Sequence, residues 1–283
     1  MNFLVEPFLS NTFLLRALIA GMLVSITCGI VGTFVVLRGL AFIGDALAHG
    51  VLPGIAAALL LGIPGIIGAS LGALVMIGGI SLITQRTRLS SDTAIGLLFV
   101  GMLALGVVIV SRSTSFSGDI VQILFGEILG INDQAVLIQV TATLILAITA
   151  AICARPFLLL CFNPEQAQVS GFSARLYHNI MLAMIAMAVI VSFQTVGTLL
   201  VFGMLLAPAG AGALLARRVE AMMAWAAAIG SLSVYVGLLT SYYLNLAAGS
   251  SIVLTATIIF FIVLAIKNIQ LAQNQRQGGE AHG

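Results

Sequence analysis

Residues 221–243, AMMAWAAAIGSLSVYVGLLTSYY, run without a single charged side chain. A helix needs roughly 20 predominantly apolar residues to cross the hydrocarbon core of a bilayer, so this stretch predicts a transmembrane helix. The whole 283-residue chain has the same character, since 61% of its residues are hydrophobic, 7% are charged and the mean hydropathy is +1.20. Soluble domains carry about 25% charged residues. The composition therefore predicts an all-α polytopic membrane protein.

Apolar runs divide the chain into eight or nine predicted transmembrane helices. They lie at 13–37, 46–62, 64–84, 92–111, 133–153, 175–194, 197–217, 221–243 and 249–267. The segment 113–132 is too polar for a span and predicts an external loop with a short interfacial or re-entrant helix. We expect one transmembrane domain over residues 1–271, followed by a disordered C-terminal tail at 272–283.

The basic residues indicate the orientation. If the spans alternate in direction, nine basic residues lie on one side of the membrane, and only Arg16 and Arg112 lie on the other. The nine are Arg38, Arg86, Arg88, Arg155, Arg175, Arg217, Arg218, Lys267 and Arg276. Because cytoplasmic loops carry the excess of Lys and Arg, the N-terminus is predicted outside and the C-terminus in the cytoplasm. The acids assigned to the outside are Glu6, Asp119, Glu127 and Asp133, a balance that attracts cations.

Small residues recur at G-x-x-x-G spacing. The pairs are Gly50/Gly54, Gly68/Gly72 and Gly126/Gly130. In membrane helices this spacing lets two backbones approach closely, so we interpret it as helix packing rather than as a ligand site.

The stretch 39–54, GLAFIGDALAHGVLPG, places an Asp and a His four residues apart in apolar sequence. On a helix, Asp45 and His49 share one face, with Cβ atoms about 5–6 Å apart. Such a pair can form a structural ion pair, relay a proton, or supply two ligands to a divalent cation such as Zn²⁺, Mn²⁺ or Fe²⁺. The residues alone leave these alternatives open. The span count puts the pair near the inner end of its span.

Two prolines and a glutamine mark candidate helix breaks. Pro53 cannot donate to the carbonyl of His49, so it is predicted to break the helix and free that oxygen. Pro208 would free the carbonyl of Met204 in the same way, and Gln194 is a polar group at another candidate break. Irregular backbone at membrane depth is tolerated where it is buried or lines a cavity. We therefore predict gating positions at these three residues.

A short helix is predicted at about 164–170, on the cytoplasmic side. Asn163 suits the N-cap, Pro164 the first helical position and Glu165 the positive end of the helix dipole, while Gly171 can end the helix in the left-handed conformation. A helix this short is marginal in water, so it is either an interfacial turn or a docking helix for a partner. The sole Lys, Lys267, follows no glycine loop, so the chain lacks a P-loop for ATP.

Five motifs together resemble the permease subunits of bacterial metal-ion ABC importers. They are VVLRGLAFIGDALAHGVLPG, TRLSSDTAIGLLF, ILFGEILGI, FNPEQAQVSG and QTVGTLLVFGMLLAPAGAGALLARR, and the resemblance covers roughly residues 13–268. It implies a transport subunit rather than an enzyme, in the bacterial cytoplasmic membrane. It also implies a homodimer with the channel at its interface, a separate cytoplasmic ATP-binding subunit and an extracytoplasmic metal-binding protein.

The resemblance also implies residue roles. Asp45 and His49 match the pair that faces the metal path. The segment 163–171 matches the segment that docks on the ATPase, which assigns coupling to Asn163, Pro164, Glu165, Ala167 and Gly171.

The expected function is ATP-driven import of a divalent metal ion, with zinc favoured and manganese or iron as alternatives. The motifs are shared among zinc, manganese and iron systems, and no His-rich loop points to zinc. We expect membrane lipid as a partner, no permanently bound cofactor and no nucleic acid. The alternative is a proton-coupled secondary transporter of metal ions that uses Asp45 and His49. A permease for siderophores or cobalamin is disfavoured, because that related group lacks the Asp/His motif.

Overall fold

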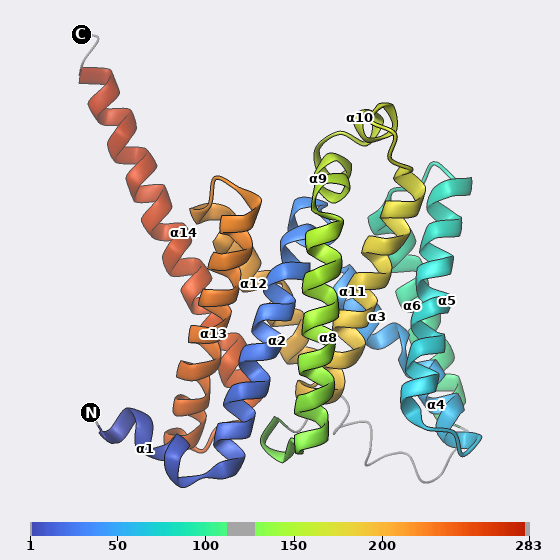
Figure 1. The fold of residues 1–283 in the computed structure, drawn as a ribbon, viewed down its shortest axis with the longest axis horizontal. Coiled ribbons are helices and arrows are strands. Elements are labelled where there is room, and N and C mark those ends of the chain that lie inside the picture. The colour runs from blue at the N-terminus through green and yellow to red at the C-terminus, as the bar shows by residue number, and fades with distance from the viewer. Residues whose placement is uncertain (1, 112–127, 281–283) are drawn as a thin grey trace.

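The computed structural model describes residues 2–111 and 128–280, and every regular element within these ranges is a helix (Figure 1). This confirms the all-α fold class. The elements are α1 (Asn2–Ser10), α2 (Thr12–Leu37), α3 (Ile43–Gly50), α4 (Leu52–Leu60), α5 (Gly65–Arg86), α6 (Ser91–Val110), the 3₁₀ turn η1 (Ile128–Gly130), α8 (Asp133–Ile152), α9 (Ala154–Phe162), α10 (Pro164–Val169), α11 (Ala174–Val196), α12 (Thr198–Leu215), α13 (Val219–Leu244) and α14 (Ala248–Glu280).

Eight segments among the described residues are long and apolar enough to cross a bilayer, and α3 and α4 together form one of them, Ile43–Leu60. α12 is a shorter apolar helix. The two termini lie at opposite ends of the long helices (Figure 1), which requires an odd number of crossings. α12 therefore supplies the ninth, within the eight or nine that the sequence predicts.

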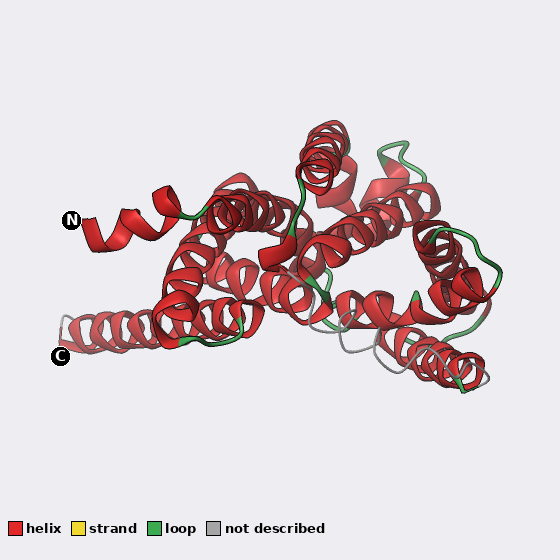
Figure 2. Ribbon diagram, turned by 90° about the horizontal axis from the view of Figure 1, so that it is seen from below, coloured by secondary structure: helices red, strands yellow, loops and turns green. Residues whose placement is uncertain are grey.

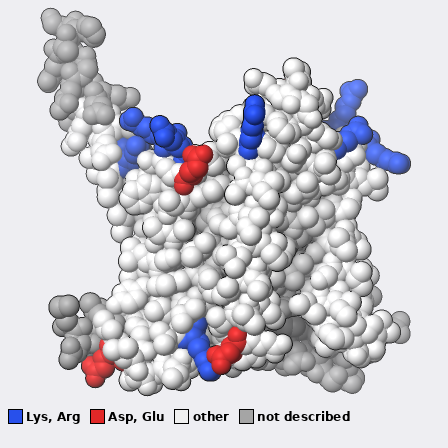
Figure 3. All heavy atoms as spheres, in the orientation of Figure 1, with Lys and Arg blue, Asp and Glu red and all other residues white. Residues whose placement is uncertain are grey.

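Charge is concentrated at the two ends of the bundle. Figure 3 shows most Lys and Arg side chains at the end where α9 and α10 lie, and a small group of mixed charge at the opposite end. The positive-inside rule assigns the Arg-rich end to the cytoplasm, so the N-terminus is outside, as predicted. Arg112, Asp119 and Glu127 lie outside the described residues.

Two groups of helices lie on either side of α3. One group is built on α2, which packs against α8, α12 and α13, while α14 packs on α12 and α13. The other contains α4, α5 and α6, which contact one another. α3 contacts members of both groups, α12 on one side and α5 and α6 on the other, and it also contacts α11. Viewed along the helix axes, the bundle has an elongated cross-section (Figure 2). In this view both termini lie on the same narrow side of the cross-section, although they are at opposite ends along the axes.

The predicted glycine packing is confirmed between α4 and α5. A Cβ atom added to Gly68 would overlap the carbonyl oxygen of Gly54 and would lie 2.6 Å from the Cβ of Ala58. Gly72 also approaches the backbone of Val51, because a Cβ there would lie 3.0 Å from its Cα. Gly126, of the third predicted pair, lies outside the described residues.

Two predictions concern the external segment 113–132 and the C-terminal tail from residue 272. The predicted external segment 113–132 falls largely outside the described residues, and its described end contains η1, which packs on α2. α14 continues as a helix to Glu280, although a disordered tail was expected from residue 272. Adding a residue to an existing helix avoids the cost of nucleation, and Gln, Ala and Arg are good helix formers. The membrane span can therefore extend into the polar sequence.

Candidate functional site

Asp45 and His49 lie on one face of α3, as their spacing predicts. His49 Nε2 is 3.4 Å from Asp45 Oδ1, and the two side chains are 22% and 38% exposed respectively. The other ring nitrogen, His49 Nδ1, is buried and has no hydrogen-bond partner. The pair thus places a carboxylate and an imidazole side by side, and the imidazole keeps one ring nitrogen without a hydrogen-bond partner.

The contacts of α3 establish the depth of this pair. The His49 ring lies 5.9 Å from the ring of Phe99, which is eight residues from the start of α6. The adjacent Gly50 packs on Met76, which is ten residues from the end of α5. At 1.5 Å per residue, these neighbours lie roughly 12–15 Å from the cytoplasmic ends of their helices. The pair therefore lies level with the middle of α5 and α6, farther from the cytoplasmic ends of the helices than the span count suggested.

The helix that carries the pair is interrupted just after it. α3 ends at Gly50, α4 begins at Leu52, and Pro53 is the second residue of α4. However, backbone N–H groups at the end of α3 donate to the carbonyls of Leu47 and His49. The prediction that Pro53 leaves the His49 carbonyl free is therefore wrong. The last turn satisfies that oxygen locally, as helix ends commonly do.

The other two predicted breaks also differ from the structure. α11 continues past Gln194 to Val196, and the interruption falls at Gly197, whose φ of 83° favours glycine. α12 runs through Pro208 without interruption, so the predicted break there is wrong. Packing of α12 against α2, α13 and α14 holds the chain in a helical path despite the proline.

The predicted short helix is present as α10, at the Arg-rich end of the bundle (Figure 1). Asn163 Oδ1 accepts a hydrogen bond from the N–H of Gln166 at 3.1 Å, and Pro164 and Glu165 occupy the first turn. α10 ends at Val169, one residue earlier than expected.

A Schellman motif closes α10 at its C-terminal end. Gly171 has φ 82°, its N–H donates to Gln168, and the N–H of Phe172 donates to the carbonyl of Ala167. Ala167 is 1% exposed, whereas Val169 is 89% exposed. α10 is therefore a helix capped at both ends that presents the apolar side chain of Val169 to the cytoplasm.

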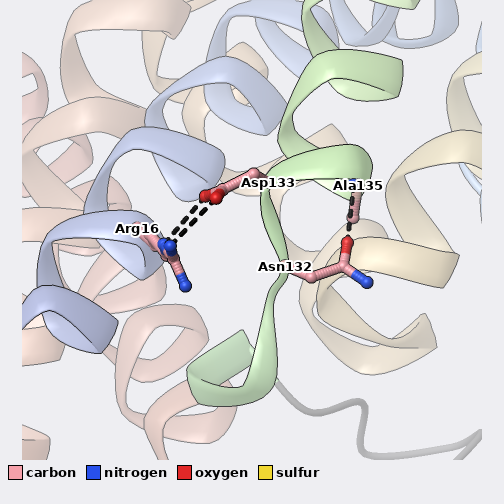
Figure 4. Close-up of polar contacts among 4 residues, drawn as sticks. All are labelled: Arg16, Asn132, Asp133 and Ala135. Atoms are coloured by element: carbon pink, nitrogen blue, oxygen red, sulfur yellow. Dashed lines mark hydrogen bonds and ion pairs between the residues drawn. The ribbon is translucent and has the colours of Figure 1, made fainter.

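At the opposite end, an ion pair joins the starts of α2 and α8 (Figure 4). Arg16 contacts Asp133 through Nε at 2.9 Å and Nη2 at 3.0 Å, and the adjacent Asn132 caps α8 by accepting from the N–H of Ala135. The sequence placed both charged residues outside and did not pair them. Their separation of 117 positions left no local signal.

A second contact that the sequence did not indicate lies at the cytoplasmic end. Arg38 was used only to assign topology, and His178, at the start of a span, carried no predicted role. In the structure, Arg38 Nη2 is 3.1 Å from His178 Nδ1, and Arg38 Nη1 donates to the carbonyl of Leu160 at 2.7 Å. Arg38 therefore connects α2, α9 and α11.

No cluster of three or more His, Cys, Asp or Glu side chains occurs among the residues that the structure describes. Within the described part of the chain, the Asp45–His49 pair is therefore a candidate site with two ligands rather than a complete metal centre. The described helices thus define a multi-span membrane protein that carries an Asp–His pair beside a helix interruption.

Comparisons with known proteins identify its family. Residues 10–267 match the ABC 3 transport family. The chain is 35% identical to the manganese transport system membrane protein MntC of Listeria monocytogenes, over 91% of this chain and 92% of that protein. It is 33% identical to a Haemophilus influenzae protein named "Probable iron transport system membrane protein", over 95% and 99% of the two chains.

A solved structure agrees. PsaBC from Streptococcus pneumoniae, in complex with Fab, superposes with a TM-score of 0.81 at 34% identity, covering 92% of this chain and 95% of that one. The chain therefore belongs to the ABC 3 transport family, as a multi-span permease of the bacterial plasma membrane.

Proposed function

We propose that this permease imports a divalent transition metal ion, with manganese as the first candidate, and that the ion passes Asp45 and His49. The names of the relatives support manganese or iron, and they give no support to the zinc preference expected from the sequence. A carboxylate and an imidazole suit such ions, because carboxylate oxygen suits Mn²⁺ and imidazole nitrogen suits iron and zinc.

The exposure of Asp45 is the observation that carries this proposal. The side chain is 38% exposed at a level near the middle of α5 and α6. A carboxylate facing lipid at that depth is costly, and such groups normally face a protein interior or a water-filled path. We infer that a second copy of the chain covers this face. Two copies would bring together two carboxylates and two imidazoles, a set that a single chain lacks.

Energy for import would come from a cytoplasmic ATP-binding subunit that docks on α10. The capped geometry of α10, with Val169 89% exposed, supports this assignment of Asn163, Pro164, Glu165, Ala167 and Gly171. An extracytoplasmic metal-binding protein would deliver the ion at the opposite end of the bundle. Gating remains a prediction at Pro53, beside the interruption between α3 and α4, whereas the breaks from which it was predicted at Gln194 and Pro208 are absent at those residues.

Metal uptake by the complete transporter tests the function. Asp45→Asn and His49→Ala should abolish accumulation of ⁵⁴Mn²⁺ while the protein still inserts and assembles. Asp133→Asn is the matched control, since it removes a carboxylate from the outer surface, and it should leave most uptake intact. Normal uptake by both α3 variants would refute the assignment of the path.

The same assay separates the alternatives. Competition by unlabelled Mn²⁺, Fe²⁺ and Zn²⁺ ranks the cargo, and strongest competition by Zn²⁺ would restore the zinc hypothesis. Uptake that needs ATP and survives a protonophore is expected. Uptake that collapses with the proton gradient while ATP is maintained would instead support the proton-coupled transporter.

A further inference from the structure

Arg38, the C-cap residue of α2, forms hydrogen bonds to two other helices. It is partly buried, and its guanidinium lies 2.7 Å from the carbonyl oxygen of Leu160 on α9 and 3.1 Å from Nδ1 of His178 on α11. Arginine only donates hydrogen bonds, so His178 must accept through an unprotonated Nδ1. The contact therefore requires the neutral imidazole with its proton on Nε2.

The bond from Arg38 satisfies the carbonyl oxygen of Leu160, which the helix itself leaves without a hydrogen-bond donor. In a continuing helix, the carbonyl of Leu160 would accept from the residue four positions later, which is Pro164 and has no N–H. The N–H of Asn163 is already donated to Leu159, at 2.8 Å. Leu160 is 2% exposed, and a buried carbonyl without a partner is costly. Arg38 supplies the missing donor.

The Leu160 carbonyl lies at the end of α9, immediately before α10. Asn163 is at once the C-cap of α9 and the N-cap of α10, so no flexible loop separates the two helices. A displacement of α10 must therefore move the end of α9 that Arg38 holds.

On its other side, Arg38 is joined stiffly to α3. The N–H of Gly39, at φ 65°, donates to Val36, and the N–H of Leu40 donates to Val35, which together form a Schellman motif. Ile43, the first residue of α3, then donates to the carbonyl of Leu40 at 3.0 Å. Asp45 follows Arg38 by only seven residues, and hydrogen-bonded turns fill the interval.

Aromatic packing runs alongside the Arg38 contacts. Phe34 on α2 meets Phe157 on α9 edge-on, with ring centroids 5.2 Å apart. Phe157 meets Tyr177 on α11 at 6.5 Å, and Tyr177 meets Phe172, which closes α10, at 5.6 Å. Chains of packed side chains and hydrogen bonds of this kind can carry energetic coupling between distant sites.

We propose that Arg38 is a positioning residue that couples movement of the docking helix α10 to the metal-bearing helix α3, through its bonds to Leu160 and His178. This inference rests on the proposed function, since it requires that α10 docks on the ATPase and that α3 carries the ion.

The test measures coupling in the purified complex of permease and ATP-binding subunit, reconstituted in liposomes and supplied with its extracytoplasmic metal-binding protein. Mn²⁺ uptake and ATP hydrolysis are recorded together for wild type, Arg38→Met and Arg155→Met. Arg155 is an exposed arginine on α9 and serves as the matched control. We expect Arg38→Met to assemble and hydrolyse ATP, while Mn²⁺ transported per ATP falls about tenfold. Arg155→Met should keep the wild-type ratio.

A second variant guards against a folding defect. His178→Leu removes one acceptor but leaves the Arg38–Leu160 bond that caps α9, and we expect it to lower the same ratio. A wild-type ratio in both variants would overturn the proposal. Failure of both to assemble would also overturn it, because the contacts would then be structural. If instead the wild-type complex moves no Mn²⁺ with ATP, the proposed function itself fails.

Discussion

Replacing Gly68 by Ala tests the close contact between α4 and α5, on which the position of the interrupted helix depends. The added methyl carbon would lie 2.6 Å from Ala58 Cβ and 2.7 Å from the carbonyl carbon of Gly54, whereas ordinary van der Waals contact begins at 3.4 Å. The obstacle includes backbone, which cannot rotate aside. The two helices must therefore separate by more than about 0.8 Å, the shortfall at Ala58 Cβ, because the carbonyl oxygen of Gly54 lies closer still.

The expected magnitude combines two opposing terms. Forcing an extra methyl group into a packed interface typically costs about 1–3 kcal/mol, and rigid backbone favours the upper part of that range. Alanine regains about 1 kcal/mol from its higher helix propensity. The free energy of unfolding should therefore fall by roughly 1–2 kcal/mol.

Gly78→Ala is the matched control on the same helix. Nothing lies within 4 Å of a Cβ atom added at Gly78, so this variant should gain up to about 1 kcal/mol. Denaturation in mixed SDS–detergent micelles would compare the unfolding free energies of the two proteins. We expect Gly68→Ala to be less stable than Gly78→Ala by roughly 2–3 kcal/mol. Equal stability would refute the close backbone approach.

Three further outcomes are expected. Asn163→Ala removes the cap that accepts from Gln166, so α10 should lose about 1 kcal/mol and bind the ATP-binding subunit several-fold more weakly in a titration; an unchanged affinity would contradict the docking role. Arg16→Met breaks a surface pair whose side chains are 46% and 79% exposed, so it should cost at most about 1 kcal/mol; a larger loss that persists in high salt would show that the Asp133 contact is more than a screened surface pair. Burial raises the pKa of the Cys161 thiol from 9.0 to about 11, so maleimide labelling at pH 8 should be roughly 100-fold slower than in the unfolded chain; equal rates would contradict that burial.

The sequence-based account of the site was accurate where the interactions are local. Asp45 and His49 share a face because they are four residues apart on one helix, and Asn163 and Gly171 cap α10 because capping depends on a few neighbouring residues. Helix breaks were less well predicted. Pro208 lies within an unbroken helix, and the break expected near Gln194 falls at Gly197, since neighbouring helices and local turns decide whether a backbone deviates.

The sequence by itself determined the membrane architecture, the orientation and the short capped helix α10, because apolar length, Arg distribution and capping residues act within short segments. Only the tertiary structure decided the depth of the Asp45–His49 pair, which follows from the packing of α3 on Phe99 and Met76. It also brought Arg38 to His178 across 140 positions. Such contacts depend on how helices pack, and packing is a property of surfaces that meet only after the chain has folded.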